Sequence, residues 1–272
     1  MKTIVVSGGN SGIGFEAVRQ LTALGHHVVM LGRDEKKGRV AAAGLTGNSG
    51  KAEFLAVDLS THDGVRSAAA TLLSAHERID VLLHTSGVLM MKDLRTTDGL
   101  HPFFAVNFLS RYHLTQRLLP SLRKSESPRV IFMTSNVPLD TKIDFALFPR
   151  FSPFVFSKMS MPIQIGNHHY AAHLRDTEKW LLAGVVNPGA ARTGIWREAA
   201  LWARLFAAVL GPFLFDSVAS SAKNPVELSV ADHWPSGSYW LKVGKIEQVT
   251  PIVLDSRDTE RVIAICRELT GA

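Results

Sequence analysis

Short runs of consecutive apolar residues alternate along this chain with longer segments of helical pattern. Unbroken apolar runs, unlike runs that alternate with polar residues, are typical of strands covered on both faces. Strands of this kind separated by helices predict parallel βαβ units, and right-handed crossovers then give a doubly wound parallel sheet in an α/β fold. The six predicted strands are Thr3–Ser7, His27–Leu31, Glu53–Val57, Ile79–His84, Arg129–Thr134 and Leu181–Val186.

The whole chain, residues 1–272, is predicted to form a single domain, because it contains no repeat, low-complexity tract or linker. Its 46% hydrophobic and 20% charged residues are ordinary for a globular protein. Residues 194–221 depart from the strand–helix pattern, since this segment is rich in tryptophan, phenylalanine and leucine. We interpret it as an apolar helical lid over the substrate cleft. An additional core helix is the simpler alternative, and a shortage of lysine disfavours a membrane-surface helix.

Charge and cysteine content limit the partners and the location. Thirty Lys and Arg against 24 Asp and Glu give a net charge of +6, without a basic run that contains aromatic residues. This pattern disfavours nucleic acid as a partner and suits a phosphorylated cofactor. Cys266 is the one cysteine, so no intrachain disulfide and no zinc site are expected. With no signal peptide and no apolar stretch of 18 residues, we expect a cytoplasmic protein without a transmembrane segment.

A glycine-rich turn follows the first predicted strand and opens a helix. Free backbone N–H groups at the positive end of a helix dipole bind pyrophosphate, and glycine allows a close backbone approach. Three glycines spaced G-x-x-x-G-x-G between a strand and a helix therefore predict a dinucleotide site. The turn residues assigned to the cofactor are Ser7, Gly8, Asn10, Ser11, Gly12, Ile13 and Gly14.

The end of the second predicted strand indicates which dinucleotide is bound. NAD-dependent enzymes usually place Asp or Glu there for the ribose hydroxyls, but this strand ends in Gly32-Arg33. A guanidinium suits a 2′-phosphate, so the pattern favours NADP(H). An ordinary solvated arginine is the alternative for Arg33. Asp58, after the third strand, is a candidate acceptor for the adenine amino group, or else an ordinary residue at a helix N-terminus.

The order of these motifs resembles the short-chain dehydrogenase/reductase family, closest to its retinol-dehydrogenase branch, over nearly the whole chain. The resemblance implies a Rossmann-type fold and roles for several further positions. His84-Thr85-Ser86-Gly87 keeps only the glycine of the family's Asn-Asn-Ala-Gly motif. The matching positions are Ser7–Gly14, Arg33, Asp58, Leu59, Gly87, Asn107, Ser135, Pro188, Gly189 and Thr193.

The family's Y-x-x-x-K motif is altered, because Lys158 is present but Phe154 stands where the tyrosine is expected. The i, i+4 spacing places both side chains on one helix face. The resemblance implies that Lys158 holds the nicotinamide ribose, Ser135 binds the substrate oxygen and Asn107 maintains a water relay. A phenyl ring carries no proton for the substrate, and loss of a positioned acid typically costs about 10²–10⁴ in rate.

No other side chain is a convincing replacement for the missing phenol. Pro162 and Gly166 are expected to disturb the helix that bears Lys158. Pairing through that helix, a possible homodimer, is therefore implied only by the resemblance. The tyrosines and the other candidate proton donors, of which His84 is the most interesting, are Tyr112, Tyr170, Tyr239, His84, Asp140, Lys142, Asp144 and His168.

Three functions are compatible with these residues. The favoured one is an NADP(H)-dependent oxidoreductase that transfers hydride to or from a bulky apolar carbonyl or enone by an altered proton path. The second is a non-redox cyclase, isomerase or lyase in which the cofactor is only structural. The third is a cofactor-binding protein without catalysis. The first is preferred because the chain retains Ser135, Lys158 and Asn107 together with the turn at Pro188-Gly189.

Overall fold

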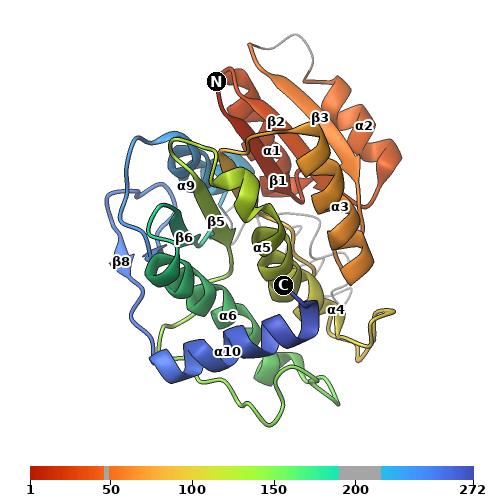
Figure 1. Cartoon of the computed structure of the whole chain (residues 1–272), viewed down its shortest axis with the longest axis vertical. Helices are drawn as coiled ribbons and strands as arrows, with labels where there is room; N and C mark the ends of the chain where they lie inside the picture. Colours follow the sequence, from red (N-terminus) through yellow and green to blue (C-terminus); the bar gives the residue numbers. More distant parts are fainter. Residues whose placement is uncertain (46–48, 190–215) are drawn as a thin grey trace.

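One eight-stranded sheet forms the centre of the protein in a computed structural model that describes residues 1–45, 49–189 and 216–272. The strand order is β3-β2-β1-β4-β5-β6-β7-β8, and only β8 is antiparallel to its neighbour (Figure 1). This arrangement confirms the doubly wound α/β fold. The strands are β1 (Thr3–Ser7), β2 (His27–Gly32), β3 (Lys51–Ala56), β4 (Val81–His84), β5 (Arg129–Met133), β6 (Leu182–Val186), β7 (Ser238–Trp240) and β8 (Thr250–Pro251).

Helices cover the sheet on both faces. Helices α1, α2 and α9 lie on one face, whereas α3, α5 and α6 lie on the other and α10 packs against the outer side of α6 (Figure 1). The described helices are α1 (Gly12–Ala23), α2 (Glu35–Ala43), α3 (His62–Ala75), α4 (Pro102–Phe104), α5 (Ser110–Leu122), α6 (Phe156–Thr177), α9 (Val218–Val230) and α10 (Ser256–Thr270), with a π-helical segment, η1 (Ala105–Leu109), between α4 and α5.

The unbroken apolar runs are explained by a core on each side of the sheet. In β1, Ile4 and Val6 face the cluster under α1 and α9, whereas Val5 faces the cluster under α3, α5 and α6. In β4, Val81 and Leu82 divide in the same way. Successive side chains of a strand point to opposite faces, so every position must be apolar when both faces are covered.

One helix prediction is corrected by the structure. Helix α6 runs without a break through Pro162 and Gly166, which were expected to disturb it. Pro162 lies in the second turn, where it removes one helix hydrogen bond, and a Cβ on Gly166 would lie 2.8 Å from the ring of Phe108. The glycine therefore allows α6 to approach η1 closely.

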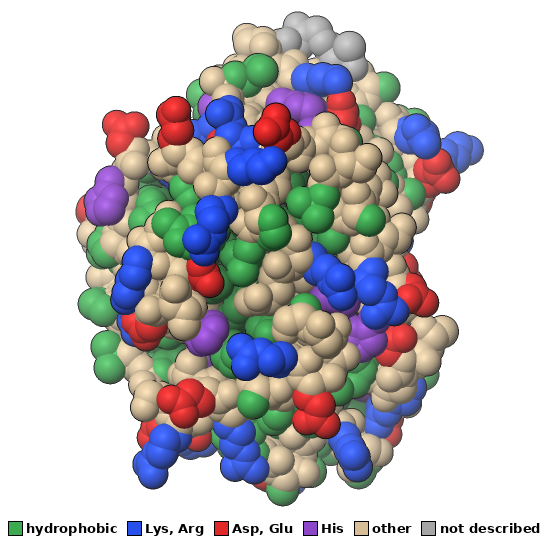
Figure 2. Space-filling view, viewed as in Figure 1, with side chains coloured by type: hydrophobic (Ala, Val, Ile, Leu, Met, Phe, Trp, Pro, Cys, Tyr) green, Lys and Arg blue, Asp and Glu red, His purple; other side chains and the backbone are tan. Residues whose placement is uncertain are grey.

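The predicted lid, residues 194–221, falls mostly outside the described residues. Of this segment the structure describes 216–221, and Val218 already begins α9, which packs against α1. No helix among the described residues has the length and apolar character needed to cross a membrane. On the face shown in Figure 2, basic and acidic side chains are intermixed.

Candidate cofactor and catalytic site

The turn between β1 and α1 lies in close contact with the chain that follows β4. Gly8 and Gly12 have φ angles of +75° and +55°, a region that favours glycine. A Cβ on Gly8 would lie 2.7 Å from Cα of Ser86, and one on Gly14 would overlap Oγ1 of Thr85. Glycine is therefore required here because the turn lies directly against the chain that follows β4.

The first turn of α1 fits an anionic group. Ser11 is the N-cap residue, but its side chain makes no capping hydrogen bond within the described part of the chain, and no acidic residue lies in the first turn. The N–H groups at this helix end remain available to a pyrophosphate. Ser7 and Ile13 are buried, and Oγ of Ser7 lies 3.0 Å from Oγ of Ser86. The side chains of Ser7 and Ile13 therefore anchor the turn in the protein interior.

The end of β2 presents a guanidinium beside this turn. Arg33 is exposed and forms no hydrogen bond or ion pair with the described residues, whereas Asp34 caps α2 by accepting from the N–H of Lys37 at 2.9 Å. A Cβ on Gly32 would lie 2.7 Å from the side chain of Asn10. An acidic residue at position 32 would therefore have to displace Asn10, whereas the arginine extends freely into solvent.

The residues predicted to bind near the adenine lie at the carboxyl end of β3. Asp58 is exposed, and its Oδ1 accepts from the N–H of Ser60 at 2.9 Å. Leu59 is buried in the core beneath α3. Asp58 thus reaches solvent at the same edge of the sheet as the glycine-rich turn, while Leu59 anchors the segment.

Asn107 secures the chain after β4. Its side-chain amide accepts from the N–H of Val88 at 2.9 Å and donates to the carbonyl of the same residue at 3.1 Å. Its own backbone carbonyl accepts from Nδ2 of Asn167 at 3.1 Å. A Cβ on Gly87 would be in ordinary contact with Oδ1 of Asn107. In this structure Asn107 therefore positions backbone, with its amide and its carbonyl both occupied by protein groups.

Ser135 and Lys158 both reach solvent near the junction of β5 and α6. Ser135 directly follows Thr134 at the carboxyl end of β5, and its N–H donates to Oε1 of Gln164 at 3.0 Å. Lys158 is exposed in the first turn of α6. The hydroxyl and the ammonium group thus come from two elements that the Gln164 side chain joins.

Phe154 does not share a helix face with Lys158, which corrects the prediction from their spacing. Helix α6 begins at Phe156, so Phe154 lies before the helix. Its side chain is buried at 6% exposure, and its ring stacks on His101 with a centroid separation of 3.5 Å and an interplanar angle of 8°. Phe154 is therefore a core residue in this structure.

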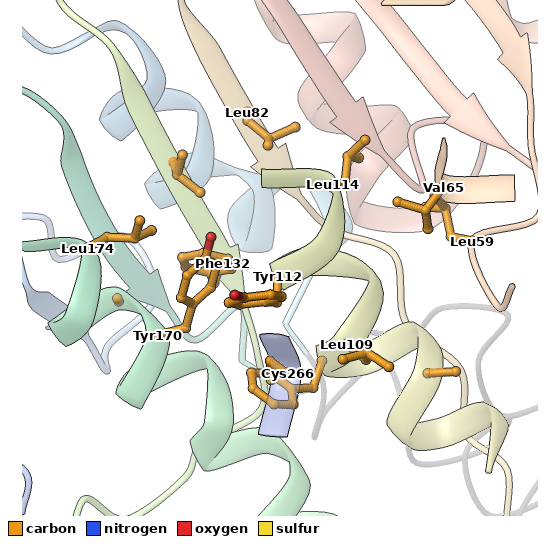
Figure 3. Close-up of a cluster of buried hydrophobic side chains, with 14 of the residues drawn as sticks. Leu59, Val65, Leu82, Leu109, Tyr112, Leu114, Phe132, Tyr170, Leu174 and Cys266 are labelled. Atoms are coloured by element: carbon orange, nitrogen blue, oxygen red, sulfur yellow. The ribbon is translucent and has the colours of Figure 1, made fainter. Parts of the chain in front are cut away.

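The three tyrosines of the chain are all engaged in the core. Tyr112 and Tyr170 lie side by side with Cys266 in the cluster under α5, α6 and α10 (Figure 3). Tyr112 donates to the carbonyl of Ala272 at 3.0 Å, and burial raises the pKa of both phenols above the usual value. Oη of Tyr239 accepts from a backbone N–H at 3.2 Å. None of these phenols faces solvent.

His84 is also unsuited to donate a proton. It is fully buried, with Nε2 3.0 Å from Oγ1 of Thr115 and its ring stacked on Phe132. Burial, reinforced by the nearby charge of Arg111, holds its pKa well below the usual value. His168 is buried as well, and burial lowers its pKa to about 3. The remaining candidates, Asp140, Lys142 and Asp144, are exposed residues between β5 and α6.

Arg111 is a residue of the site that the sequence analysis did not identify. It is buried at 3% exposure and bonds the ends of two strands, donating from Nη2 to the carbonyl of Ser86 at 2.6 Å and from Nη1 to that of Met133 at 2.8 Å. Nη1 also lies 3.3 Å from Oδ1 of Asn167. The signal available in the sequence was an arginine one helical turn after Asn107.

The turn after β6 contains Pro188 and Gly189, two of the positions that match the family's motifs. Asn187 donates from Nδ2 to the carbonyl of Leu241 at 2.9 Å, and its Oδ1 accepts from the N–H of Gly189 at 3.0 Å. Gly189, after Pro188, has a φ of +75°. Thr193 lies outside the described residues. The part of the turn that is described is held rigidly at the carboxyl end of β6.

An open helix N-terminus at the carboxyl edge of a doubly wound sheet defines a dinucleotide-binding α/β protein. The family model for short chain dehydrogenases matches residues 2–148, and the chain belongs to this family. It is 28% identical to retinol dehydrogenase 12 of Mus musculus over 99% of this chain and 86% of that one. It is 32% identical to a short-chain dehydrogenase/reductase of Armillaria gallica over 72% and 67%, respectively. Its relatives also include the polyprenol dehydrogenase of Homo sapiens, at 24% identity over 99% and 85%.

Solved structures support the same fold. A short-chain dehydrogenase/reductase from Serratia marcescens aligns with a TM-score of 0.68 at 19% identity, covering 91% of this chain and 98% of that one. A metagenomic short-chain oxidoreductase in complex with NADP aligns with a TM-score of 0.62 at 22% identity, covering 89% and 96%. At these identities the likeness concerns the fold. Membership of the family makes the chain one of a group of oxidoreductases that bind nicotinamide cofactors.

Proposed function

We propose that this protein is an NADP(H)-dependent oxidoreductase that transfers hydride to or from a bulky apolar carbonyl or enone without a phenolic acid. The proposal depends chiefly on the uncapped first turn of α1 and on the end of β2, where the exposed Arg33 follows Gly32, a residue that lies against Asn10 of the β1–α1 turn. The open N–H groups suit a pyrophosphate, and the guanidinium suits a 2′-phosphate. Asn10, which fills the space next to Gly32, opposes the acidic residue that NAD enzymes use.

The residues at the β5–α6 junction have distinct tasks in this proposal. When bound, NADP(H) supplies or accepts the hydride. Lys158 holds the nicotinamide ribose through its exposed ammonium group, and the hydroxyl of Ser135 binds the substrate oxygen. Because no phenol is available, the proton comes from water. An enone needs less acid assistance at its oxygen than a simple ketone, so it is the favoured substrate type.

The relatives support an apolar substrate. Two of them are named for retinol and polyprenol, which are long apolar alcohols. Apolar side chains are also abundant in residues 194–215, which lie outside the described part of the structure. Binding pockets for ligands of this kind are lined mainly by hydrophobic and aromatic side chains.

A second function, cofactor binding without carbonyl reduction, is favoured by one observation. Phe154 is buried against His101, and Tyr112, Tyr170 and Tyr239 are all in the core. The described part of the chain therefore offers no phenol to a substrate. A protein of this kind would retain the cofactor site and respond to the cofactor without turning over substrate.

Cofactor binding and redox turnover are tested separately. Titration with NADPH and with NADH, followed by nicotinamide fluorescence, is expected to show tighter binding of NADPH. Apolar enones are expected to oxidise bound NADPH. Saturated ketones are expected to oxidise it far more slowly. Binding without oxidation by any enone would favour the second function. Failure to bind either cofactor would contradict both.

A further inference from the structure

The buried guanidinium of Arg111 is the centre of a hydrogen-bond network that joins the chain after β4, the end of β5 and helix α6. Through Ser86 and Met133 it bonds the chain at the carboxyl ends of β4 and β5. Through Asn167 it connects to the carbonyls of Asn107 and Gln164, each 3.1 Å from Nδ2 of Asn167. Oε1 of Gln164 in turn accepts from the N–H of Ser135.

This network contains a positive charge without a negative partner among the described residues. None of the ion pairs in the described ranges involves Arg111, and its Nε has no hydrogen-bond partner there. Its hydrogen bonds go to two backbone carbonyls and a neutral amide. His84, the neighbouring titratable group, is buried and neutral, so it adds no compensating charge. A buried, uncompensated cation costs several kcal/mol and acts on any charge that binds nearby.

We propose that Arg111 determines which oxidation state of the cofactor the protein prefers, by favouring the neutral reduced nicotinamide over the cationic oxidised ring. This inference rests on the proposed function. In open α/β sheets the ligand binds in the crevice outside the carboxyl ends of the strands. Ser86 follows β4 and Met133 ends β5, so the guanidinium that bonds both of their carbonyls lies at this edge of the sheet.

The two oxidation states differ by one unit of charge on the nicotinamide ring, so a nearby cation discriminates between them. Coulomb's law gives about 1.4 kcal/mol for unit charges about 12 Å apart at an effective dielectric constant of about 20, which is roughly tenfold in affinity. The charge is buried, so salt should screen the effect only weakly. Arg111 is thus a specificity-determining and positioning residue, and it makes no contact with substrate.

The experiment compares the dissociation constants of NADPH and NADP⁺ for the full-length protein and its variants. In the wild type we expect NADPH to bind at least tenfold more tightly than NADP⁺, with little change in that ratio between low and high salt. Arg111→Met should lower the ratio about tenfold, mainly by strengthening NADP⁺ binding. Arg111→Lys retains the charge and should keep most of the ratio, although it loses the forked hydrogen bonds and should lower the melting temperature.

Arg117→Met is the matched control, because Arg117 lies on the same helix but bonds His113 on the side of α3. It should leave the ratio unchanged. An unchanged ratio in a folded Arg111→Met variant would overturn the inference while leaving the proposed function intact. If that variant does not fold, the wild type decides, since equal affinities for NADPH and NADP⁺ would also overturn it. Failure of the wild type to bind either form would instead remove the proposed function.

Discussion

The β1–α1 turn and the β5–α6 junction reach the same edge of the sheet by different physical means. At the turn, the positions of Gly8 and Gly14 are set by backbone contacts that exclude any side chain. At the junction, Phe154 is placed by the packing of its ring on His101. A site formed by backbone contacts can therefore be recognised from residue types and spacing. A site formed by side chains depends on which neighbouring residues each side chain packs against.

The largest effect is expected from Gly14→Ala, which tests the backbone contacts of the turn. The added methyl group would overlap Oγ1 of Thr85 and the carbonyl of Gly8. Overpacking of this kind typically costs 1–3 kcal/mol, and the rigid backbone here places the expected loss of unfolding free energy at about 3 kcal/mol. Urea unfolding measures the loss, and NADPH titration should show that binding disappears.

Gly44→Ala is the control for the same chemical change. Gly44 ends α2 with a helical φ of −67°, and a Cβ there would meet nothing closer than 3.6 Å. The variant should be at least as stable as the wild type, because alanine lowers the entropy of the unfolded chain. A Gly14→Ala protein that still binds NADPH normally would show that the turn does not constrain the site.

This contrast also explains what the sequence was able to predict. The apolar runs and the glycine spacing predicted the sheet and the turn, because β1, β2 and β4 are buried on both faces and Gly8 and Gly14 meet backbone. The spacing of Phe154 and Lys158 predicted a shared helix face, but α6 begins only at Phe156. No local pattern reports that His101, from a distant segment, stacks on the ring of Phe154.

Arg111 is a second residue whose role could not be predicted from the local sequence. An arginine in a helix is expected to be solvated, because arginine is rarely buried. Its role becomes visible only when the strand ends at Ser86 and Met133 are placed around it. Contacts between residues far apart in the sequence, such as these, arrange the carboxyl edge of the sheet. Local sequence patterns do not report such contacts.

The next largest effect concerns the guanidinium beside the turn. Arg33→Ala should weaken NADPH binding by about 2 kcal/mol, or roughly thirtyfold, because hydrogen bonds to charged groups contribute about 1.5–3 kcal/mol. NADH lacks the 2′-phosphate, so its affinity should change little. Fluorescence titration of both cofactors at two salt concentrations measures the difference, which should be smaller at high salt.

Arg39→Ala provides the comparison for a nearby arginine of similar exposure. Arg39 lies on α2 and pairs with Glu35 on the surface, so its removal should leave both affinities as in the wild type. Equal losses for NADPH and NADH in Arg33→Ala would mean that Arg33 does not read the 2′-phosphate, and the preference for NADP(H) would be wrong.

Helix α6 contains a pH-sensitive element that the β1–α1 turn lacks. Burial lowers the pKa of His168 from 6.5 to about 3, and neither ring nitrogen has a hydrogen-bond partner among the described residues. Below pH 6.5 the unfolded chain binds a proton that the folded state excludes. The contribution of His168 to stability should therefore be complete above pH 6.5 and fall by about 1.4 kcal/mol per pH unit below it.

His168→Phe should remove this contribution, since a phenyl ring preserves the edge-to-face contact with Tyr239. Between pH 7.5 and pH 5.5, the variant should lose about 1.4 kcal/mol less unfolding free energy than the wild type. Urea unfolding at both pH values measures this, with the exposed residue variant His233→Gln as the control. Identical pH dependence in His168→Phe and the wild type would show that His168 is accessible to protons in the folded state.

The smallest effect is expected from Phe154→Tyr, the change that introduces the tyrosine predicted from the Y-x-x-x-K motif. If residue 154 were placed by backbone contacts, as Gly8 and Gly14 are, this single substitution would complete the catalytic site near Lys158. Because Phe154 is buried on His101 before the start of α6, the new hydroxyl group should enter the core and not the substrate site. We expect a loss of about 1 kcal/mol in unfolding free energy from burying the hydroxyl, and no gain in ketone reduction.

Phe156→Tyr is the matched control, because Phe156 is only half-buried at the first residue of α6 and packs edge-on against Phe103. Its added hydroxyl can reach water, so stability should change less than for Phe154→Tyr. A gain of NADPH-dependent ketone reduction in Phe154→Tyr would show that residue 154 turns toward Lys158 when cofactor is bound. The β5–α6 junction would then form its site only when the cofactor binds, whereas the β1–α1 turn is already formed without it.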